Sequence, residues 1–200
     1  MRQLFWLRSS WLPDGCERVE VSDSGGRSFY SEHLRLSTGT TSGSLSRLEK
    51  DWISGFASWS KRRVVSFMIG FLNIAYARVR VWSGAYFKGT GAPSFGVYVD
   101  NNSPNTTATL YGFSWDGSSG TDISLGTVTE DNVYLITIEF TPGQSVKFYV
   151  NGSLVGTVTS NLPPTTTAAY AWGAFRAEIY NYSASDLWLT IYQVACTQEL

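Results

Sequence analysis

Residues 133–164 read VYLITIEFTPGQSVKFYVNGSLVGTVTSNLPP, and this stretch predicts three consecutive antiparallel strands. Within it, residues 134–140 alternate so that the even positions share one face, which is typical of a strand. Residues 141–144 contain the Pro-Gly pair of a tight turn, because proline fixes φ and glycine tolerates a positive φ. Asn151 and Gly152 then form the pair that two-residue type I′ hairpin turns favour, since their twist matches that of the flanking strands.

Alternation of the same kind predicts strands along most of the remaining chain. They are expected at residues 4–12, 17–21, 28–37, 64–71, 74–82, 94–100, 107–115, 123–128, 165–175, 176–180 and 186–196. Residues 44–52 are ambiguous, because Leu45, Leu48 and Trp52 would line one face of a helix, whereas Leu48, Lys50 and Trp52 share one strand face. The all-β surroundings favour the strand.

The number and spacing of these strands define the fold class. Roughly a dozen strands at intervals of about 8 to 14 residues, with no strong helix, are typical of an all-β sandwich or barrel. No internal repeat and no linker divides the sequence. We therefore predict a single all-β domain over residues 1–200, in which residues 1–15 form an N-terminal arm or a first strand.

Charge and hydropathy argue against several classes of function. Charged residues make up 16% of the chain and the formal net charge is −1, so the basic excess of a nucleic-acid-binding protein is missing. The one basic run, Lys61-Arg62-Arg63, is better explained as a solvated turn than as a phosphate site. No apolar run approaches the roughly 20 residues that span a bilayer. The apolar run near the N-terminus is too short for a signal peptide and is interrupted by Arg8. We therefore expect an intracellular protein, or one that leaves the cell by another route, such as in a virus particle.

The two cysteines, Cys16 and Cys196, lie near opposite ends of the chain. Two separate buried thiols are the favoured interpretation, because an unpaired cysteine behaves as a small apolar residue. A disulfide between them is the alternative if the terminal strands are neighbours, and it requires their Cα atoms to lie within about 7 Å. With a single histidine and two distant cysteines, the sequence offers no zinc site.

Residues 139–163, EFTPGQSVKFYVNGSLVGTVTSNLP, resemble the late hairpin of concanavalin A-like lectin and glucanase jelly rolls. In that family an alternating apolar strand and a turn precede F-Y-[VI]-N-G, which residues 148–152 match here. Residues 34–48, LRLSTGTTSGSLSRL, resemble the early strands of phage and prophage members. The resemblance covers residues 28–196 and implies an antiparallel two-sheet jelly-roll sandwich with closely spaced termini. It implies no single function, because the fold carries lectins, hydrolases, lyases and structural modules.

The residues that make enzymes of this fold active are only partly matched. The glucanase branch carries E-x-D-x-E or E-x-D-x-x-E on one strand, which places two carboxyl groups about 5–5.5 Å apart. Here Glu139 and Glu178 are single carboxylates within predicted strands. The alginate-lyase branch is matched superficially by residues 31–35 and 86–89, but its Q-[IV]-H strand is missing and His33 alone would be the base. We therefore expect no catalytic residues.

Aromatic side chains beside polar loops are the remaining functional signal, because sugars stack on aromatic rings while polar groups bind their hydroxyls. The candidate carbohydrate-binding residues are Trp82, Tyr86, Asp100, Asn102, Trp115 and Tyr149, with Tyr170 and Trp172 as further aromatic residues near loops. Core packing is the competing role for each aromatic residue. Asp100 and Asn102 are also weak candidates for calcium, whose hard oxygen ligands gather at turns, but an Asx-rich turn is the favoured explanation.

These observations predict a non-catalytic structural or attachment module of a virus or phage particle, lying on the virion or an extracellular surface and binding carbohydrate. Its expected partners are a glycan or other virion proteins, with a homo-oligomer as a further form and no cofactor apart from calcium. Two alternatives stay open. One is a carbohydrate-active hydrolase or lyase with an atypical site, and the other is an interaction module that assembles an oligomer through a sheet face or an edge strand.

Overall fold

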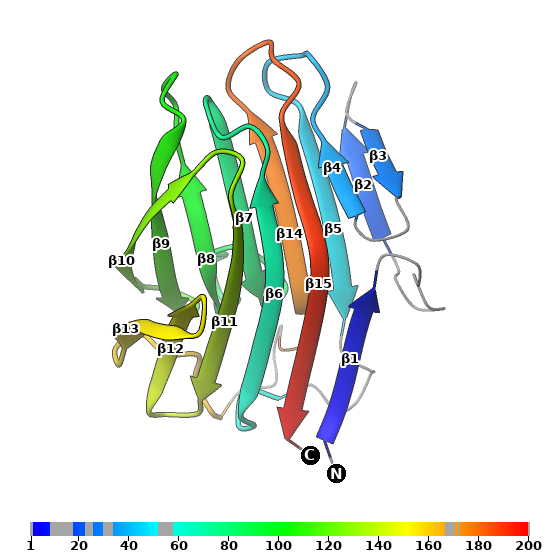
Figure 1. Cartoon of the computed structure of the whole chain (residues 1–200). Coiled ribbons are helices and arrows are strands. Elements are labelled where there is room, and N and C mark those ends of the chain that lie inside the picture. Colours follow the sequence, from blue (N-terminus) through cyan, green and yellow to red (C-terminus); the bar gives the residue numbers. More distant parts are fainter. Residues whose placement is uncertain are drawn as a thin grey trace.

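A computed structural model describes residues 2–8, 18–22, 26–29, 34–51, 58–166, 171 and 173–199 of the chain. Throughout these residues the regular secondary structure is β-strand, and fifteen strands form two antiparallel sheets that lie face to face (Figure 1). The prediction of an all-β, two-sheet sandwich is confirmed, with more strands than expected. No helix long and apolar enough to cross a membrane occurs in the described ranges.

One sheet has eight strands. They are β1 (Arg2–Arg8), β3 (Gly26–Phe29), β4 (Leu34–Ser37), β6 (Arg63–Phe71), β11 (Val133–Thr141), β12 (Ser145–Val150), β13 (Ser153–Val158) and β15 (Trp188–Glu199). Their order is β13-β12-β11-β6-β15-β4-β3, and β1 pairs with β15. Strand β6 therefore lies inside this sheet, between β11 and β15 (Figure 1).

The other sheet has seven strands. They are β2 (Arg18–Ser22), β5 (Leu45–Asp51), β7 (Ala77–Ser83), β8 (Ser94–Asp100), β9 (Thr107–Trp115), β10 (Gly120–Thr129) and β14 (Gly173–Asn181). Their order is β10-β9-β8-β7-β14-β5-β2. Strand β7 is therefore central, with its chain neighbour β8 on one side and the distant strand β14 on the other.

The stretch at residues 133–164 folds as predicted. Strands β11, β12 and β13 are consecutive and antiparallel. At the first turn, the Gln144 N–H donates to Thr141 O over 3.0 Å. At the second turn, Asn151 and Gly152 have φ values of 51° and 82°, and a type I′ turn requires two positive φ values.

Within the ambiguous segment at residues 44–52, residues 45–51 form strand β5, so the strand interpretation is confirmed for them, and residue 52 lies outside the described residues. This strand pairs on both sides, because Leu45 lies opposite Tyr180 of β14 and opposite Ser22 of β2. Pairing with two neighbours overrides the local helix propensity, which is a weak preference.

Three other predicted strands differ from the structure. Residues 28–37, expected to be one strand, are divided between β3 and β4, which pair with each other. The strand expected at residues 74–82 begins only after Tyr76, whose φ of 57° interrupts the extended backbone. The third is the strand expected at residues 165–175, because residues 165 and 166 lie in a turn and residues 173–175 begin β14; residues 176–180 are strand, as expected. Residues 167–170 and 172 lie outside the described part of the chain.

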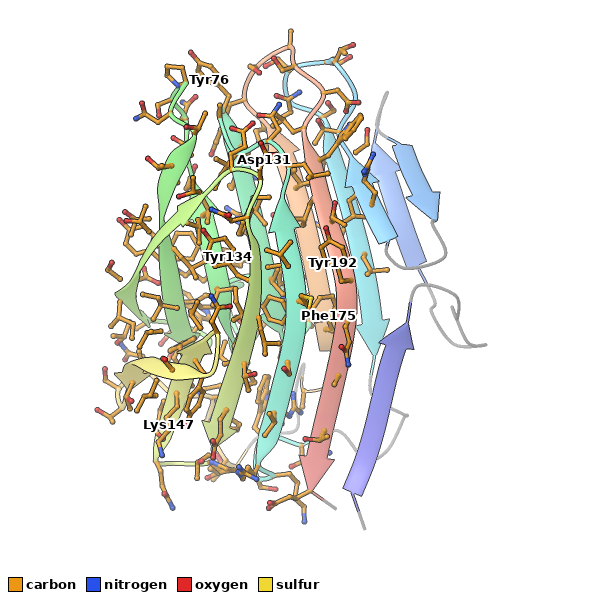
Figure 2. All side chains as sticks on the ribbon, viewed as in Figure 1. Tyr76, Asp131, Tyr134, Lys147, Phe175 and Tyr192 are labelled. Carbon is orange, nitrogen blue, oxygen red and sulfur yellow. The ribbon has the colours of Figure 1, made fainter. Side chains whose placement is uncertain are left out.

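The core is one apolar layer between the two sheets, and Phe175, labelled in Figure 2, is one of its side chains. Phe67 on β6 meets Phe175 on β14 across this layer, with ring centroids 5.6 Å apart in an edge-on contact. Phe95 on β8 stacks on Phe140 of β11 at 5.3 Å. Rings from both sheets therefore interlock, which fixes how the sheets sit on each other.

Arg63, the first residue of β6, is buried in this layer. Its Nη2 donates to Ala171 O at 2.7 Å and to Ser58 O at 3.2 Å, and its guanidinium lies 4.1 Å from the Trp59 ring centroid. Burial lowers the pKa of Arg63 to about 9, and interaction with Cys196 acts in the opposite direction. The solvated-turn prediction is therefore wrong for Arg63. Its donors satisfy carbonyl oxygens that face the apolar layer.

The first and last strands lie side by side, because β1 pairs with β15 and Arg2 lies opposite Glu199 (Figure 1). The closely spaced ends implied by the family resemblance are confirmed. Cys196 is buried in β15, and its Sγ lies 3.9 Å from Ala174 O. Cys16 lies outside the described residues, so the favoured interpretation of two separate thiols and the alternative of a disulfide both stay untested.

Replacing Phe67 by alanine would leave a cavity in the apolar layer, because this side chain is fully buried. We expect the free energy of unfolding to fall by about 3–5 kcal/mol. The matched control is Ser66→Ala, which removes an outward hydroxyl that bonds Thr137 over 2.9 Å and should cost no more than about 1 kcal/mol. Urea denaturation followed by fluorescence measures both, and equal losses would contradict the placement of Phe67 in the core.

Arg63 and Arg62 are adjacent in sequence but should differ in their effect on stability. Arg63→Met removes donors from two backbone carbonyl oxygens, so we expect the free energy of unfolding to fall by about 2–4 kcal/mol. Arg62→Met removes partly exposed ion pairs with Glu139, at 2.8 Å, and with Glu199, at 3.6 Å, and should cost at most about 1 kcal/mol. Chemical denaturation of both variants checks the difference. A larger loss for Arg62→Met would show that the buried guanidinium is dispensable.

Candidate functional site

We name the side of the seven-stranded sheet that points away from the core the outer face. Side chains alternate along a strand, so the neighbours of buried residues such as Val79 and Val97 project to this face. The outward residues of four adjacent strands are Arg78, Arg80 and Trp82 on β7, Tyr98 and Asp100 on β8, Tyr111 and Phe113 on β9, and Arg176, Glu178 and Tyr180 on β14. The register sets them in rows, with Arg80 lying between Glu178 and Tyr98.

An ion-pair network crosses β5, β14 and β7 on the outer face. Glu178, which is 2% exposed, binds Arg47 Nη2 at 2.8 Å through Oε2 and Arg80 Nη1 at 3.0 Å through Oε1. Arg176 is also buried, and its Nη1 lies 2.6 Å from Glu49 Oε1. Burial lowers the pKa of Arg80, and Glu178 opposes this shift. The charges of the network thus alternate in sign, which offsets the cost of removing Glu178 and Arg176 from water.

Phe87 lies on the outer face because the segment at residues 84–93, which joins β7 to β8, folds over it. The Phe87 ring makes edge-on contacts with three outward rings, at centroid distances of 5.7 Å to Trp82, 4.8 Å to Phe113 and 5.8 Å to Tyr98. The Arg80 guanidinium lies 4.2 Å from the Phe87 centroid, in a cation–π contact. A second aromatic cluster therefore exists outside the core.

Hydrogen bonds hold both ends of the 84–93 segment. The Gly84 N–H donates to Gly173 O at 2.9 Å, and the Gly91 N–H donates to Gly117 O at 2.6 Å. Gly84 has a φ of 121°, and a Cβ at this position would lie 2.6 Å from a backbone oxygen. Only glycine fits there, which explains how the chain can turn back over the sheet directly after β7.

Lys88 ties the 84–93 segment to β10. Its Nζ binds Asp122 Oδ1 at 2.6 Å and lies 4.6 Å from the Tyr98 ring centroid. The Tyr98 ring in turn stacks on Tyr111, with centroids 5.1 Å apart and planes 18° apart. Burial, followed by the negative charge of Asp122, raises the pKa of Tyr98 to about 12. The Tyr98 hydroxyl therefore stays protonated at physiological pH.

The structure brings three of the sequence-predicted binding residues to the 84–93 segment. Tyr86 belongs to the segment and is 53% exposed, whereas Trp82 lies beneath it and is 3% exposed. Trp115 is half-buried, and its Nε1 donates to Gly89 O at 2.9 Å. Trp82 is therefore buried, but on the outer face and not in the core.

The other candidate binding residues lie elsewhere. Asp100 ends β8 on the outer face and accepts a hydrogen bond from the Tyr182 hydroxyl at 2.7 Å. Asn102 is exposed in the turn that follows. Tyr149 lies on β12 in the other sheet, so it does not join the group around Trp82. Three further residues fall outside the described part of the chain: His33, Tyr170 and Trp172.

The two strand carboxylates, Glu139 and Glu178, lie on opposite sides of the sandwich. Glu178 is on the outer face, whereas Glu139 projects from β11 away from the core and binds Arg62 at 2.8 Å. Packed sheets are about 10 Å apart, and these side chains point away from each other. They therefore cannot form the closely spaced pair that a retaining glycosidase requires.

The turn after β8, which suggested calcium, is organised by hydrogen bonds. The buried side chain there is Asn101, whose Nδ2 donates to Ile74 O at 3.0 Å and to Asn105 O at 2.7 Å. Across the residues that the structure describes, no three His, Cys, Asp or Glu side chains gather so that they could hold a metal ion. The favoured Asx-rich turn agrees with these contacts.

Several residues that dominate the outer face were not found by sequence reasoning: Phe87, Tyr98, Tyr111 and Asp122. Alternation along residues 74–82 predicts that Arg78, Arg80 and Trp82 share one strand face, but it does not show that this face is turned away from the core. The sequence signal that could have identified the outer face is the presence of aromatic and charged residues together at alternate positions of consecutive strands.

No family model and no curated protein matches this sequence. Solved structures do match it. The CBM2 module of the evolved Dit protein of Lactobacillus casei BL23 phage J-1 has a TM-score of 0.63 and 14% identity, covering 98% of this chain and 96% of that one. A β-glucanase of Bacillus licheniformis has a TM-score of 0.67 and 15% identity, covering 96% of each chain.

Toxin domains show the same likeness. The binding domain of botulinum neurotoxin DC in complex with SialylT has a TM-score of 0.55 and 10% identity, covering 90% of this chain and 42% of that one. Likenesses at such low identity show the fold alone. The chain has the concanavalin A-like jelly-roll fold of the glucanases and of the phage module, as the resemblance of its late hairpin implied.

Proposed function

We propose that this chain is a non-catalytic carbohydrate-binding module. The observation that carries the proposal is the outer face, where the exposed ring of Tyr86 and the stacked rings of Tyr98 and Tyr111 lie among charged side chains. A sugar has an apolar face that packs on aromatic rings, and hydroxyl groups that bind polar side chains. The outer face offers both kinds of contact.

Charged groups of both signs surround these rings. Lys88 and Asp122 form an ion pair next to Tyr98. The Arg78 guanidinium lies 4.3 Å from the Tyr180 ring centroid, near the same end of the face as Asp100. Hydroxyl groups both donate and accept hydrogen bonds, so a face of mixed charge suits a neutral or weakly charged glycan better than a polyanion.

The same face argues against glycoside hydrolysis by the described residues. The outward positions of β7 hold Arg78, Arg80 and Trp82, and those of β14 hold Arg176, Glu178 and Tyr180, so neither strand carries two alternating carboxylates. Glu178 is buried, and both of its oxygens are held by arginines. A general acid must reach the leaving group with its proton, and a buried carboxylate clamped by two guanidinium groups is poorly placed to do so.

We further propose that the module serves in attachment and belongs to the surface of a phage or virus particle. The structural likeness to a module of a phage protein over 98% of this chain supports this location. The resemblance of residues 34–48 to the early strands of phage and prophage members supports it as well. Residues 1–200 would then form one jelly-roll domain. Immunogold electron microscopy of particles tests the location, and absence of the protein from particles would contradict it.

Tyr111→Ala should weaken glycan binding about tenfold or more, because it removes a ring from the outer face. A tenfold loss of affinity corresponds to about 1.4 kcal/mol of binding free energy. The matched control is Tyr149→Ala, which removes a ring from the opposite sheet and should bind like the wild-type chain. A glycan array that includes β-1,3-1,4-glucan and sialylated oligosaccharides selects the ligand, and calorimetry then measures both variants.

Two results would contradict this assignment of the site. One is the absence of binding to any glycan on the array by the folded wild-type chain. The other is a larger loss of affinity in Tyr149→Ala than in Tyr111→Ala, which would move the site to the eight-stranded sheet.

Glu178→Gln tests whether this carboxylate is structural. The change leaves Arg47 and Arg80 without their buried counter-charge, so we expect the free energy of unfolding to fall by about 2–4 kcal/mol. Glu139→Gln is the control, because its ion pair is at the surface and should contribute at most about 1 kcal/mol. We expect no reducing-end release from polysaccharides by the wild-type chain. Release that disappears in Glu178→Gln without loss of stability would favour a hydrolase.

A further inference from the structure

The ring of Phe87 covers an aromatic cluster that lies outside the core. Trp82 and Phe113 are 3% and 0% exposed, yet they are on the outer face, with the sheet between them and the core. Phe87 contacts both rings and also lies 4.2 Å from the Arg80 guanidinium. The sheet beneath Phe87 thus has the composition of a sugar subsite, occupied by a phenyl ring of the chain itself.

Two polar atoms in this covered region meet no hydrogen-bond acceptor among the described residues. They are Trp82 Nε1 and Arg80 Nε, and both atoms are buried. Buried donors are nearly always paired in folded proteins, because an unpaired donor loses its hydration without compensation. A phenyl ring offers no oxygen atom, whereas a sugar carries hydroxyl and ring oxygens. A hydroxylated ring in the place of Phe87 would therefore supply the missing acceptors.

One of the contacts that hold the segment around Phe87, the Lys88–Asp122 ion pair, can be released without disturbing the core. Lys88 has a φ of 49°, a left-handed conformation that is strained for a residue with a Cβ and persists only where its surroundings hold it. Its ion pair with Asp122 joins side chains that are 21% and 42% exposed. Such a pair is weak and is screened by salt. Gly84 and Gly91, with φ values of 121° and 70°, flank this region and allow the backbone to turn.

We propose that the 84–93 segment is a displaceable strap and that Phe87 occupies a hidden sugar subsite. When the strap lifts, a pyranose unit of the glycan takes the place of the Phe87 ring. Its oxygen atoms accept hydrogen bonds from Trp82 Nε1 and Arg80 Nε, and the binding surface at Tyr98 is extended across β7. This inference rests on the proposed carbohydrate-binding function and adds a closed state that competes with the ligand.

Chemical labelling of tryptophan tests whether the strap opens, with no glycan present. Trp59 is fully buried in the core and Trp188 is 37% exposed. Trp59 therefore gives the slowest rate of oxidation and Trp188 the fastest, and the rate of Trp82 is compared with both. With limiting N-bromosuccinimide and peptide mass spectrometry, we expect Trp82 to be oxidised at least about tenfold faster than Trp59, because local opening precedes global unfolding. Asp122→Asn releases Lys88 and should raise this ratio further. Equal rates for Trp82 and Trp59 would overturn the strap.

Binding measurements decide whether Phe87 competes with the ligand. The probes are a β-1,3-1,4-glucan tetrasaccharide and sialyllactose, titrated by calorimetry into the wild-type chain, Phe87→Ala and Tyr86→Ala. We expect Phe87→Ala to bind the probe that the wild-type chain recognises about tenfold more tightly, because the closed state no longer competes. Tyr86→Ala is the matched truncation of the exposed neighbour and should not tighten binding.

The outcomes separate the strap from the proposed function. Normal binding by the wild-type chain with unchanged or weaker binding by Phe87→Ala would overturn the strap and leave the carbohydrate-binding function in place. If Phe87→Ala does not fold, wild-type affinity in about 0.5 M NaCl replaces it, since screening of the Lys88–Asp122 pair should tighten binding and no change would overturn the strap. Failure of both proteins to bind either probe would contradict the carbohydrate-binding function and displacement by a sugar together.

Discussion

The outer face depends on the single apolar layer that joins the two sheets. Each strand turns alternate residues into that layer, and contacts such as Phe67 with Phe175 hold the sheets together. Because only every second residue of a strand packs in the core, the residues between the packed ones are available for other roles. On β7 and β14 those positions carry arginines and Glu178, which form ion pairs on the outer face, and Arg176 and Glu178 are buried there. The core therefore supports the candidate site without contributing side chains to it.

Local features of the chain could be read from the sequence because neighbouring residues determine them. The hairpin at Asn151 and Gly152 needs only two residues with positive φ between alternating strands, and the strand at residues 94–100 needs only a regular alternation. The site could not be read in this way. Arg80 meets Glu178, which lies 98 positions later, because β14 inserts beside β7. That pairing is a property of the whole sheet and has no local signal.

Two residues reverse the usual relation between polarity and position. Arg63 is charged and lies in the core, where backbone carbonyl oxygens accept its hydrogen bonds. Phe87 is apolar and lies on the outer face, where it shields Trp82 and Phe113. A hydropathy pattern places such residues on the wrong side of a sheet. It contains no information about the distant polar groups that will bind a charged residue or the loops that will cover an apolar one. The position of Arg63 is explained by the carbonyl oxygens that it binds, and that of Phe87 by the aromatic rings that it contacts.

The pairing of β1 with β15 has a consequence for how this fold can be combined with other proteins. Paired strands lie about 4.8 Å apart, so the chain leaves the sandwich almost where it enters it. A host protein could carry such a domain within one of its surface loops by opening that loop by only about 5 Å. The host core would keep its own packing, and the outer face of the seven-stranded sheet, which lies on the sheet that does not contain β1 and β15, would stay turned toward the surroundings.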